Sequence, residues 1–209
     1  MKSILAFGDS LTWGHDPRDG SRHAYDDRWT SVLEAALDGA ARLIPEGLNG
    51  RTTSFDDHAA PCCRNGARAL PMLLTSHMPL DLVIVMLGTN DLKPRFGGRA
   101  VTAQEGMRRL AEIVRLQPTK PEGHVPRLLI VAPPPCAAMT GSDLPAGERS
   151  VAESHRIAPL YRTLAEELDC AFFDAGAVAR ADPADGVHLD AANTRAIGAA
   201  LLPMVRALL

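Results

Sequence analysis

Four short apolar runs constrain the fold of this chain more than any other feature of the sequence. They cover residues 3–7, 82–87, 128–131 and 171–173. Each run is continuous rather than alternating with polar residues, which is typical of strands covered on both faces. A weaker candidate covers residues 41–48, where Pro45 allows only an edge strand or a strand end. The runs therefore predict the strands of a buried sheet.

Helical patterns lie between and after these runs. They cover residues 26–37, 102–116, 153–168 and 191–208. Asp26 or Asp27 is placed to cap the first helix, and Pro159 predicts a kink or break in the third. Thr102 and Glu105 form a capping-box pattern in the second. Strands that alternate with helices predict a parallel sheet with helices on both faces, the α/β class.

The composition argues against several classes of protein. The chain has 209 residues, which indicates one domain and at most two. Its formal net charge of −3 and its aromatic content of 4% give no sign of a nucleic-acid partner. No apolar stretch is long enough to span a membrane, and the first apolar run is too short for a signal peptide. We expect a soluble, cytoplasmic protein with no membrane partner.

The cysteines form no recognisable metal or disulfide pattern. They are Cys62, Cys63, Cys136 and Cys170. The first two are adjacent, which is a poor geometry for pairing with each other, and no CxxC spacing occurs. We therefore expect neither a zinc site nor a disulfide framework.

Chemically useful side chains follow the predicted strands. They are Ser10 in "GDSL", Gly50 in "NGRT", Asn90 in "GTND", and Asp185 and His188 in "DGVHLD" before the last helix. In open parallel sheets, ligands bind beyond the carboxyl ends of the strands. We therefore expect these four loops to converge on one edge of the sheet.

The residue types fit nucleophilic catalysis. A serine hydroxyl is a weak nucleophile, so Ser10 needs a base such as His188, which Asp185 can orient through the other ring nitrogen. The Ser10 and Gly50 backbone N–H groups and the Asn90 amide are candidates for an oxyanion hole. The stretch is neither a G-x-S-x-G elbow nor a P-loop, since residue 12 is Thr and no Gly-Lys-Ser/Thr follows.

Each of these residues also has a purely structural explanation. Gly-Asp-Ser is a common turn composition, and a glycine such as Gly50 often serves only a positive φ. Asn90 and Asp190 can simply cap helices, and His188 can be an ordinary surface residue. The functional interpretation is favoured because four separate loops would otherwise supply matching chemistry by accident.

The blocks "FGDSLTWG", "GLNGRTT", "LGTND" and "DGVHLD" resemble, in order, the four blocks of the SGNH (GDSL) hydrolases. The blocks run from Phe7 to Asp190, so the resemblance implies a single domain over residues 1–209. It implies a flavodoxin-like three-layer α/β/α sandwich with a five-stranded parallel sheet. It also implies hydrolysis of a small-molecule ester, with no cofactor and no metal.

Within that family, stretches such as "RWTSVL" and "FFDAG" resemble the arylesterase/acyltransferase branch. The resemblance implies cleavage of small aryl and short-chain esters, and acyl transfer to alcohols or hydrogen peroxide in some members. It also implies a homo-oligomer, up to an octamer, whose neighbouring loops narrow the channel. His15 stands where the branch can carry a second aromatic residue, and a more polar channel would favour water over alcohols.

Four further residues are expected near the substrate. They are Trp13, His15, Asn49 and Thr89. Trp13 either lines the acyl pocket or packs under the adjacent helix. Arg51 is expected to hold the Gly50 loop through its hydrogen-bond fork.

Two other functions stay open at this stage. A deacetylase that acts on acetylated sugars would use the same residues on another substrate. A non-catalytic binding module would keep the fold without an activated Ser10.

Overall fold

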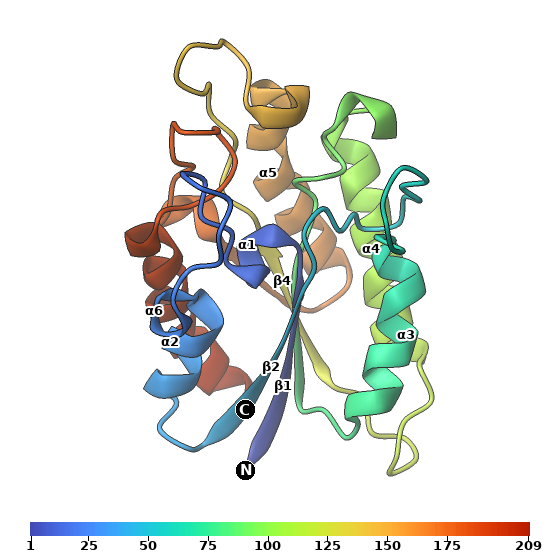
Figure 1. Ribbon diagram of the computed structural model, residues 1–209. Coiled ribbons are helices and arrows are strands. Elements are labelled where there is room, and N and C mark those ends of the chain that lie inside the picture. Colours follow the sequence, from blue (N-terminus) through green and yellow to red (C-terminus); the bar gives the residue numbers. More distant parts are fainter.

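The computed structural model describes all residues from 1 to 209 and contains one five-stranded, wholly parallel sheet (Figure 1). The strands are β1 (Lys2–Gly8), β2 (Ala41–Gly47), β3 (Leu82–Met86), β4 (Arg127–Ala132) and β5 (Ala171–Asp174). Their order is β2-β1-β3-β4-β5, the flavodoxin-like order. Pro45 lies in the edge strand β2, where its missing N–H costs no interior ladder bond. The predicted strands and fold class are confirmed.

Six helices accompany the sheet. They are α1 (Ser10–Trp13), α2 (Trp29–Ala36), α3 (Gly66–His77), α4 (Ala100–Leu116), α5 (Val151–Glu167) and α6 (Ala191–Leu208). Helices α2 and α6 pack on one face, and α3, α4 and α5 cover the other, which gives three layers (Figure 1). None of the helices combines the length and the apolar character needed to cross a membrane.

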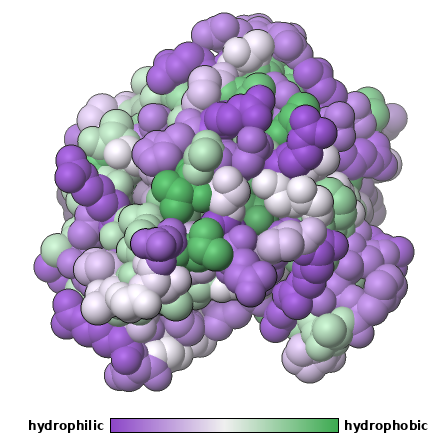
Figure 2. All heavy atoms as spheres, turned by 90° about the horizontal axis from the view of Figure 1, so that it is seen from above, coloured by the Kyte–Doolittle hydropathy of each residue, from purple (hydrophilic) through white to green (hydrophobic).

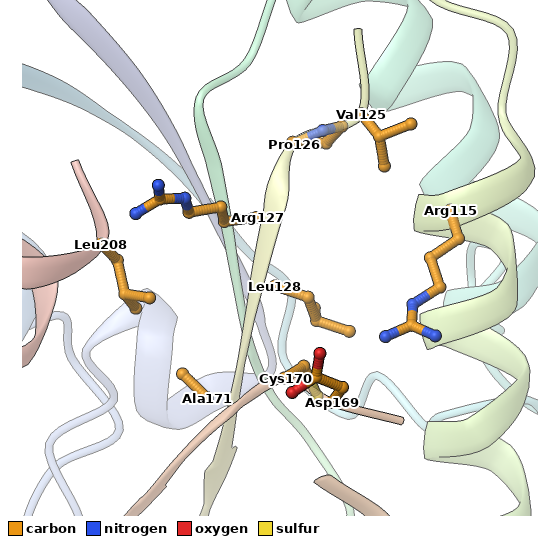
Figure 3. A pocket seen from close by; sticks show the side chains of 9 residues that line it. All are labelled: Arg115, Val125, Pro126, Arg127, Leu128, Asp169, Cys170, Ala171 and Leu208. Atoms are coloured by element: carbon orange, nitrogen blue, oxygen red, sulfur yellow. The ribbon is translucent and has the colours of Figure 1, made fainter. Parts of the chain in front are cut away.

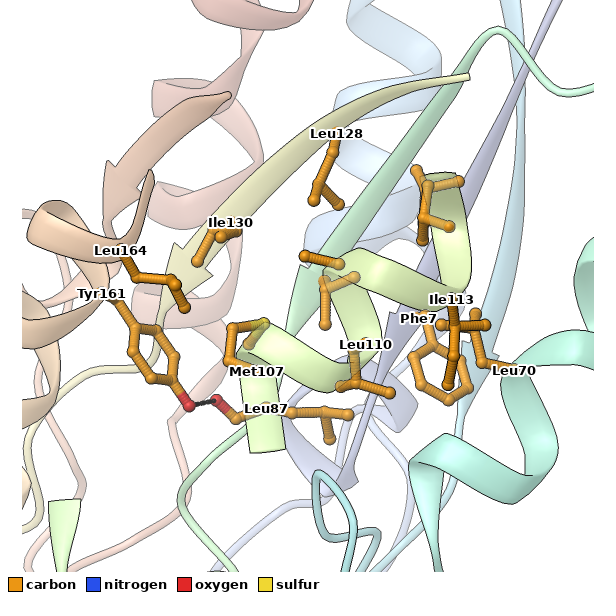
Figure 4. Close-up of a cluster of buried hydrophobic side chains, with 14 of the residues drawn as sticks. Phe7, Leu70, Leu87, Met107, Leu110, Ile113, Leu128, Ile130, Tyr161 and Leu164 are labelled. Atoms are coloured by element: carbon orange, nitrogen blue, oxygen red, sulfur yellow. Dashed lines mark hydrogen bonds between the residues drawn. The ribbon is translucent and has the colours of Figure 1, made fainter. Parts of the chain in front are cut away.

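The apolar strands divide their side chains between two buried clusters. Leu5 and Phe7 of β1 point to the α3–α4–α5 side, whereas Ile4 and Ala6 point to the α2–α6 side. Every residue of β3 is buried, because helices lie on both of its faces. Figure 4 shows the first cluster, in which the Tyr161 hydroxyl donates a hydrogen bond of 3.0 Å to the Leu87 carbonyl.

Two predicted helix starts are wrong. Helix α2 begins after Arg28, which makes no side-chain cap bond, and Asp27 instead pairs with Arg195 of α6. Helix α4 begins at Ala100, so the capping box at Thr102 lies inside the helix. In α2 a contact distant in the sequence engages Asp27, whereas in α4 the Thr102 hydroxyl donates to the nearby Arg99 carbonyl at 2.7 Å.

The cap of α4 comes from another helix. Glu153 of α5 accepts the Ala100 N–H at 2.7 Å, which satisfies one of the free donors of the first turn. Helix α5 itself runs from Val151 through Pro159 to Glu167, so the predicted break is absent. Helix α6 has the predicted bounds, and Asp190 caps it by accepting the Asn193 N–H at 2.7 Å.

The fold predicts a measurable cost for removing the Tyr161 hydroxyl. Tyr161 is wholly buried, so Tyr161→Phe removes a donor to the Leu87 carbonyl. We expect a loss of about 1–3 kcal/mol in the free energy of unfolding, measured by urea denaturation. Tyr25→Phe is the matched control, because its hydroxyl contact with Glu34 is exposed. Equal losses in the two variants would contradict the prediction.

Candidate active site

Ser10 is held at the carboxyl end of β1 by a tight strand-to-helix turn. Asp9 caps helix α1, with its carboxylate accepting the Leu11 N–H at 3.0 Å. The turn needs glycine before it, because a Cβ on Gly8 would lie 2.1 Å from Thr12 Oγ1. Ser10 is therefore the first residue of α1, at the rim of the sheet, and 7% of its surface is exposed to solvent.

The structure brings Ser10, His188 and Asp185 into one hydrogen-bonded chain. His188 Nε2 lies 2.8 Å from Ser10 Oγ, and His188 Nδ1 lies 2.5 Å from Asp185 Oδ2. The other carboxylate oxygen, Asp185 Oδ1, accepts the backbone N–H groups of Val187 and His188 at 2.8 and 2.9 Å. These bonds fold the short loop so that the acid reaches the imidazole three residues away.

The surroundings of Asp185 favour its ionised form. Partial burial raises the pKa of this carboxyl, but the hydrogen bonds from His188 and Val187 outweigh burial and bring the pKa below its ordinary value. The carboxylate is thus set to stabilise a positive charge on His188.

A second imidazole lies against the first. The centroids of the His15 and His188 rings lie 4.1 Å apart, and the backbone N–H of His15 donates to the Ser10 carbonyl at 3.0 Å. Partial burial and the neighbouring His188 lower the pKa of His15. His15 therefore favours the neutral form at physiological pH.

Two residues that line the site, Ser10 and Gly50, have backbone N–H groups without a protein acceptor. Neither the Ser10 N–H nor the Gly50 N–H donates a hydrogen bond within the chain. Gly50 adopts φ +81°, a region that favours glycine. Arg51 holds this loop as expected, because its buried guanidinium donates to the carbonyls of Gly8, at 2.8 Å, and Glu46. Burial lowers the pKa of Arg51 to about 10.

The Asn90 side chain joins three loops. Its Nδ2 donates to the Arg51 carbonyl at 3.0 Å and to Asp9 Oδ2 at 3.1 Å. Its Oδ1 accepts from Arg149 Nη2 at 2.9 Å, and Arg149 Nε also donates to the Thr89 carbonyl. Because Arg149 can only donate, it fixes the amide orientation and turns the NH₂ group toward the Gly50 loop. The amide hydrogens are already engaged, so an oxyanion would share them.

Asp91 is a structural acid. It is wholly buried, and its carboxyl accepts the Thr53 N–H at 3.1 Å and the Thr53 hydroxyl. Burial, with a smaller contribution from Asp9, raises the pKa of Asp91 to about 7.

Ser10 and His188 lie in a small polar cleft of about 180 Å³. It is lined by Ser10, His15, Asn49, Gly50, Arg64, Asn90, Lys93, Arg149 and His188. None of the lining residues is hydrophobic. Figure 2 views the molecule from this side, and hydrophilic residues cover most of the surface, with a few hydrophobic ones near its middle.

Two of the four expected pocket residues line the cleft directly. His15 and Asn49 line the cleft, but Trp13 and Thr89 do not. Trp13 packs under the Arg22 guanidinium, which lies 5.1 Å from its ring. Thr89 is 3% exposed, and its carbonyl accepts a hydrogen bond of 2.9 Å from Arg149 Nε.

A larger hollow of about 410 Å³ lies near the amino ends of β4 and β5, at the opposite edge of the sheet from Ser10 (Figure 3). Its one thiol, Cys170, has a pKa raised by burial, so it favours the unreactive protonated form. No histidine lines this hollow. It therefore offers no nucleophile with a base, unlike the cleft at Ser10.

His15, Asp185 and His188 are the one group that could hold a metal ion. Their ligand atoms lie within 4.8 Å of one another. Both ring nitrogens of His188 are already engaged, one with Asp185 and one with Ser10. A metal would have to displace those bonds, so the residues suit a proton relay better than a metal centre.

Comparison with known proteins places the chain in a family. The model of the GDSL-like lipase/acylhydrolase family matches residues 6–196. The chain belongs to this family. The SGNH hydrolase resemblance is therefore confirmed, and family membership makes the chain a carboxylic ester hydrolase. The comparison with curated proteins found no match.

Several solved structures are similar over the whole chain. A protein of Agrobacterium tumefaciens str. C58 to which an arylesterase function is ascribed is 63% identical, with a TM-score of 0.98 and 100% of both chains covered. A carbohydrate acetylesterase family member from Sinorhizobium meliloti is 52% identical, with a TM-score of 0.94 and coverage of 100% and 99%. The aryl esterase of M. smegmatis is 42% identical, with a TM-score of 0.91 and 100% of both chains covered.

Three cleft residues were not predicted from the sequence. Arg64, Lys93 and Arg149 reach the site from loops between the strands and helices. Lys93 stands three residues after Asn90, and this spacing was the only available signal. Arg149 is 59 residues from Asn90, so no local pattern could connect them.

The raised pKa of Asp91 predicts the pH dependence of stability. In the folded chain the carboxyl keeps its proton up to about pH 7, whereas the ordinary value is 3.8. The stabilising contribution of the protonated form is therefore complete below about pH 4 and is lost as pH rises through about 7. Relative to the wild type, Asp91→Asn should gain as much as about 4 kcal/mol between pH 4 and 8. Parallel curves of unfolding free energy against pH would contradict this prediction.

Proposed function

We propose that this hydrolase cleaves small aryl or short-chain carboxylic esters through an acyl-enzyme on Ser10. The observation that carries the proposal is the continuous chain from Ser10 Oγ through His188 to Asp185, with distances of 2.8 and 2.5 Å. Such a chain is the arrangement that activates a serine hydroxyl.

In the first step, Ser10 Oγ attacks the ester carbonyl while His188 Nε2 accepts the hydroxyl proton. Asp185 stabilises the imidazolium through Nδ1 and fixes its tautomer. The tetrahedral intermediate collapses when His188 returns the proton to the leaving oxygen, which releases the alcohol or phenol. Water then attacks the acyl-enzyme with His188 again as base, and the acid leaves.

The negative charge of the intermediate is stabilised by the Ser10 N–H, the Gly50 N–H and the Asn90 amide. The two backbone groups have no competing acceptor in the chain. The Asn90 amide contributes with its orientation already set by Arg149. Donors that are already positioned lower the barrier because they need no reorganisation during reaction.

A second candidate is an acetylated-sugar deacetylase. The absence of hydrophobic residues from the cleft lining favours a polar substrate, and a 52% identical neighbour belongs to a carbohydrate acetylesterase family. Side-by-side assays on phenyl acetate and on acetylated xylan would separate the candidates. A panel of rising acyl length, run with and without an added alcohol, would report chain preference and acyl transfer together. We expect water to outcompete alcohols, because His15 makes the entrance polar.

The nucleophile is tested by Ser10→Ala. We expect the turnover of 4-nitrophenyl acetate to fall by at least about 10³-fold, because no hydroxyl remains to form the acyl-enzyme. Ser76→Ala, on the exposed surface of α3, is the matched control and should keep full activity. A fluorophosphonate probe should label the wild type and the control but not Ser10→Ala. Near-normal turnover without Ser10 would contradict its role as the nucleophile, and no labelling of the wild type would favour a non-catalytic module.

The oxyanion role of Asn90 is tested separately. Asn90→Ala should lower kcat for phenyl acetate by about 10²–10³-fold with little change in KM, because the amide acts mainly on the transition state. Urea unfolding of the variant shows whether it still folds, since Asn90 also bonds Asp9 and the Arg51 carbonyl. An unchanged kcat in a folded variant would assign the oxyanion to the two backbone donors alone.

A further inference from the structure

The cleft beside Ser10 carries more positive charge than ester hydrolysis requires. Arg64, Lys93 and Arg149 all line it, and no acidic side chain does. We propose that the preferred substrates are esters that carry a carboxylate, which binds at Lys93 and Arg64. This inference rests on the proposed esterase function and names the chemical class of its substrate.

Lys93 is a cation without a partner. Its ammonium takes part in no hydrogen bond and no ion pair of the chain, although the side chain is only partly exposed. Burial, together with the neighbouring Arg149 and Arg95, lowers the pKa of Lys93 to about 8. A cation that is partly desolvated among other cations gains from an anion placed beside it.

Arg64 lies directly against the oxyanion loop. A Cβ on Gly50 would lie 2.9 Å from Arg64 Cζ, so the guanidinium covers that glycine. Its Nε is buried without a hydrogen-bond partner, and its Nη1 lies 3.4 Å from Asp57. Asp57 is shared with Arg95, which it contacts at 3.0 Å. One carboxylate thus serves two guanidinium groups, and Arg64 keeps donors for another anion.

Arg149 is the third cation of the cleft, and together Arg64, Lys93 and Arg149 form its positive wall. It stands in no ion pair, and its guanidinium donates to the carbonyls of Thr89 and Ala146 and to the Asn90 amide. A Cβ on Gly147 would lie 2.9 Å from Arg149 Nη1 and 3.7 Å from Lys93 Cε, so the two cations meet there. Arg149 is committed to these neutral oxygens, so it contributes charge rather than a direct contact.

The two carboxylates behind the cleft, Asp9 and Asp185, do not line it. Asp185 is bound by His188, and Asp9 is wholly buried with a pKa raised by burial. Lysine and arginine both bind carboxylates, arginine with a planar fork. An anionic ester therefore finds counter-ions within the same small cleft as the nucleophile.

Two matched ester pairs test the substrate class. For the leaving-group side, 4-acetoxybenzoate is compared with 4-acetoxybenzamide, and for the acyl side, phenyl hydrogen adipate with phenyl adipamate. Each kcat/KM is divided by the rate constant for hydrolysis of the same ester by hydroxide, which corrects for differences in the intrinsic reactivity of the esters. We expect the anionic member of at least one pair to be preferred by about tenfold at low salt, and less at high salt. The two pairs also locate the carboxylate on the substrate.

Two variants that each lose one positive charge test whether the preference for anionic esters arises in the cleft. Lys93→Met should lower the anionic-to-neutral ratio about threefold or more, and Lys93→Arg should retain it. Lys120→Met removes the same charge from the loop before β4, at the opposite edge of the sheet, and should leave the ratio unchanged. Equal effects of Lys93→Met and Lys120→Met would overturn the inference, because net charge alone would then explain the preference.

Binding without turnover separates this inference from the proposed function. Calorimetry compares adipate with adipamide on the wild type and on Lys93→Met. If the wild type cleaves esters but the neutral members react as fast in both pairs, the substrate class is wrong and the esterase function stands. If none of the four compounds is cleaved, the proposed function fails. Tighter binding of adipate that depends on Lys93 would then still support the anion site, and equal binding would overturn it.

Discussion

The site depends on the hydrogen bonds of one buried amide. Asn90, after β3, donates to Asp9 at the end of β1 and to the Arg51 carbonyl in the loop after β2, and it accepts from Arg149 in the loop before α5. Four separate segments therefore meet at a single side chain. Because all of its bonds are directional, the amide sets the distance between Ser10 and the Gly50 loop as well as its own orientation.

Burial of charge is the second organising constraint. Asp9 and Asp91 are wholly buried behind the site, and burial raises the pKa of both. Arg51 and Arg149 are buried near them and bind mainly backbone carbonyls rather than carboxylates. Burial thus disfavours the charged form of the acids, whereas the arginines keep their charge at physiological pH. Arg149 brings this positive charge to the cleft, where Arg64 and Lys93 add to it.

Much of the fold could be predicted because the apolar runs are buried on both faces. The strands, the edge position of Pro45 and the bounds of α6 follow from periodicity and proline geometry. Helix starts could not be predicted as well. Asp27 stands beside the start of α2 yet pairs with Arg195, and the donor at the start of α4 is satisfied by Glu153 of another helix. Local patterns cannot show a partner that is distant along the chain.

The sequence by itself determined the chemical groups that meet at the carboxyl edge. Ser10, Gly50, Asn90 and the Asp185–His188 pair each follow a strand or precede a helix, and parallel topology brings such positions together. Only the tertiary structure decided the surroundings of that chemistry. It left Trp13 and Thr89 out of the cleft lining and placed cations from three loops in it. The physical reason is that strand periodicity specifies a backbone edge, whereas loop side chains are placed by long-range charge and hydrogen-bond contacts.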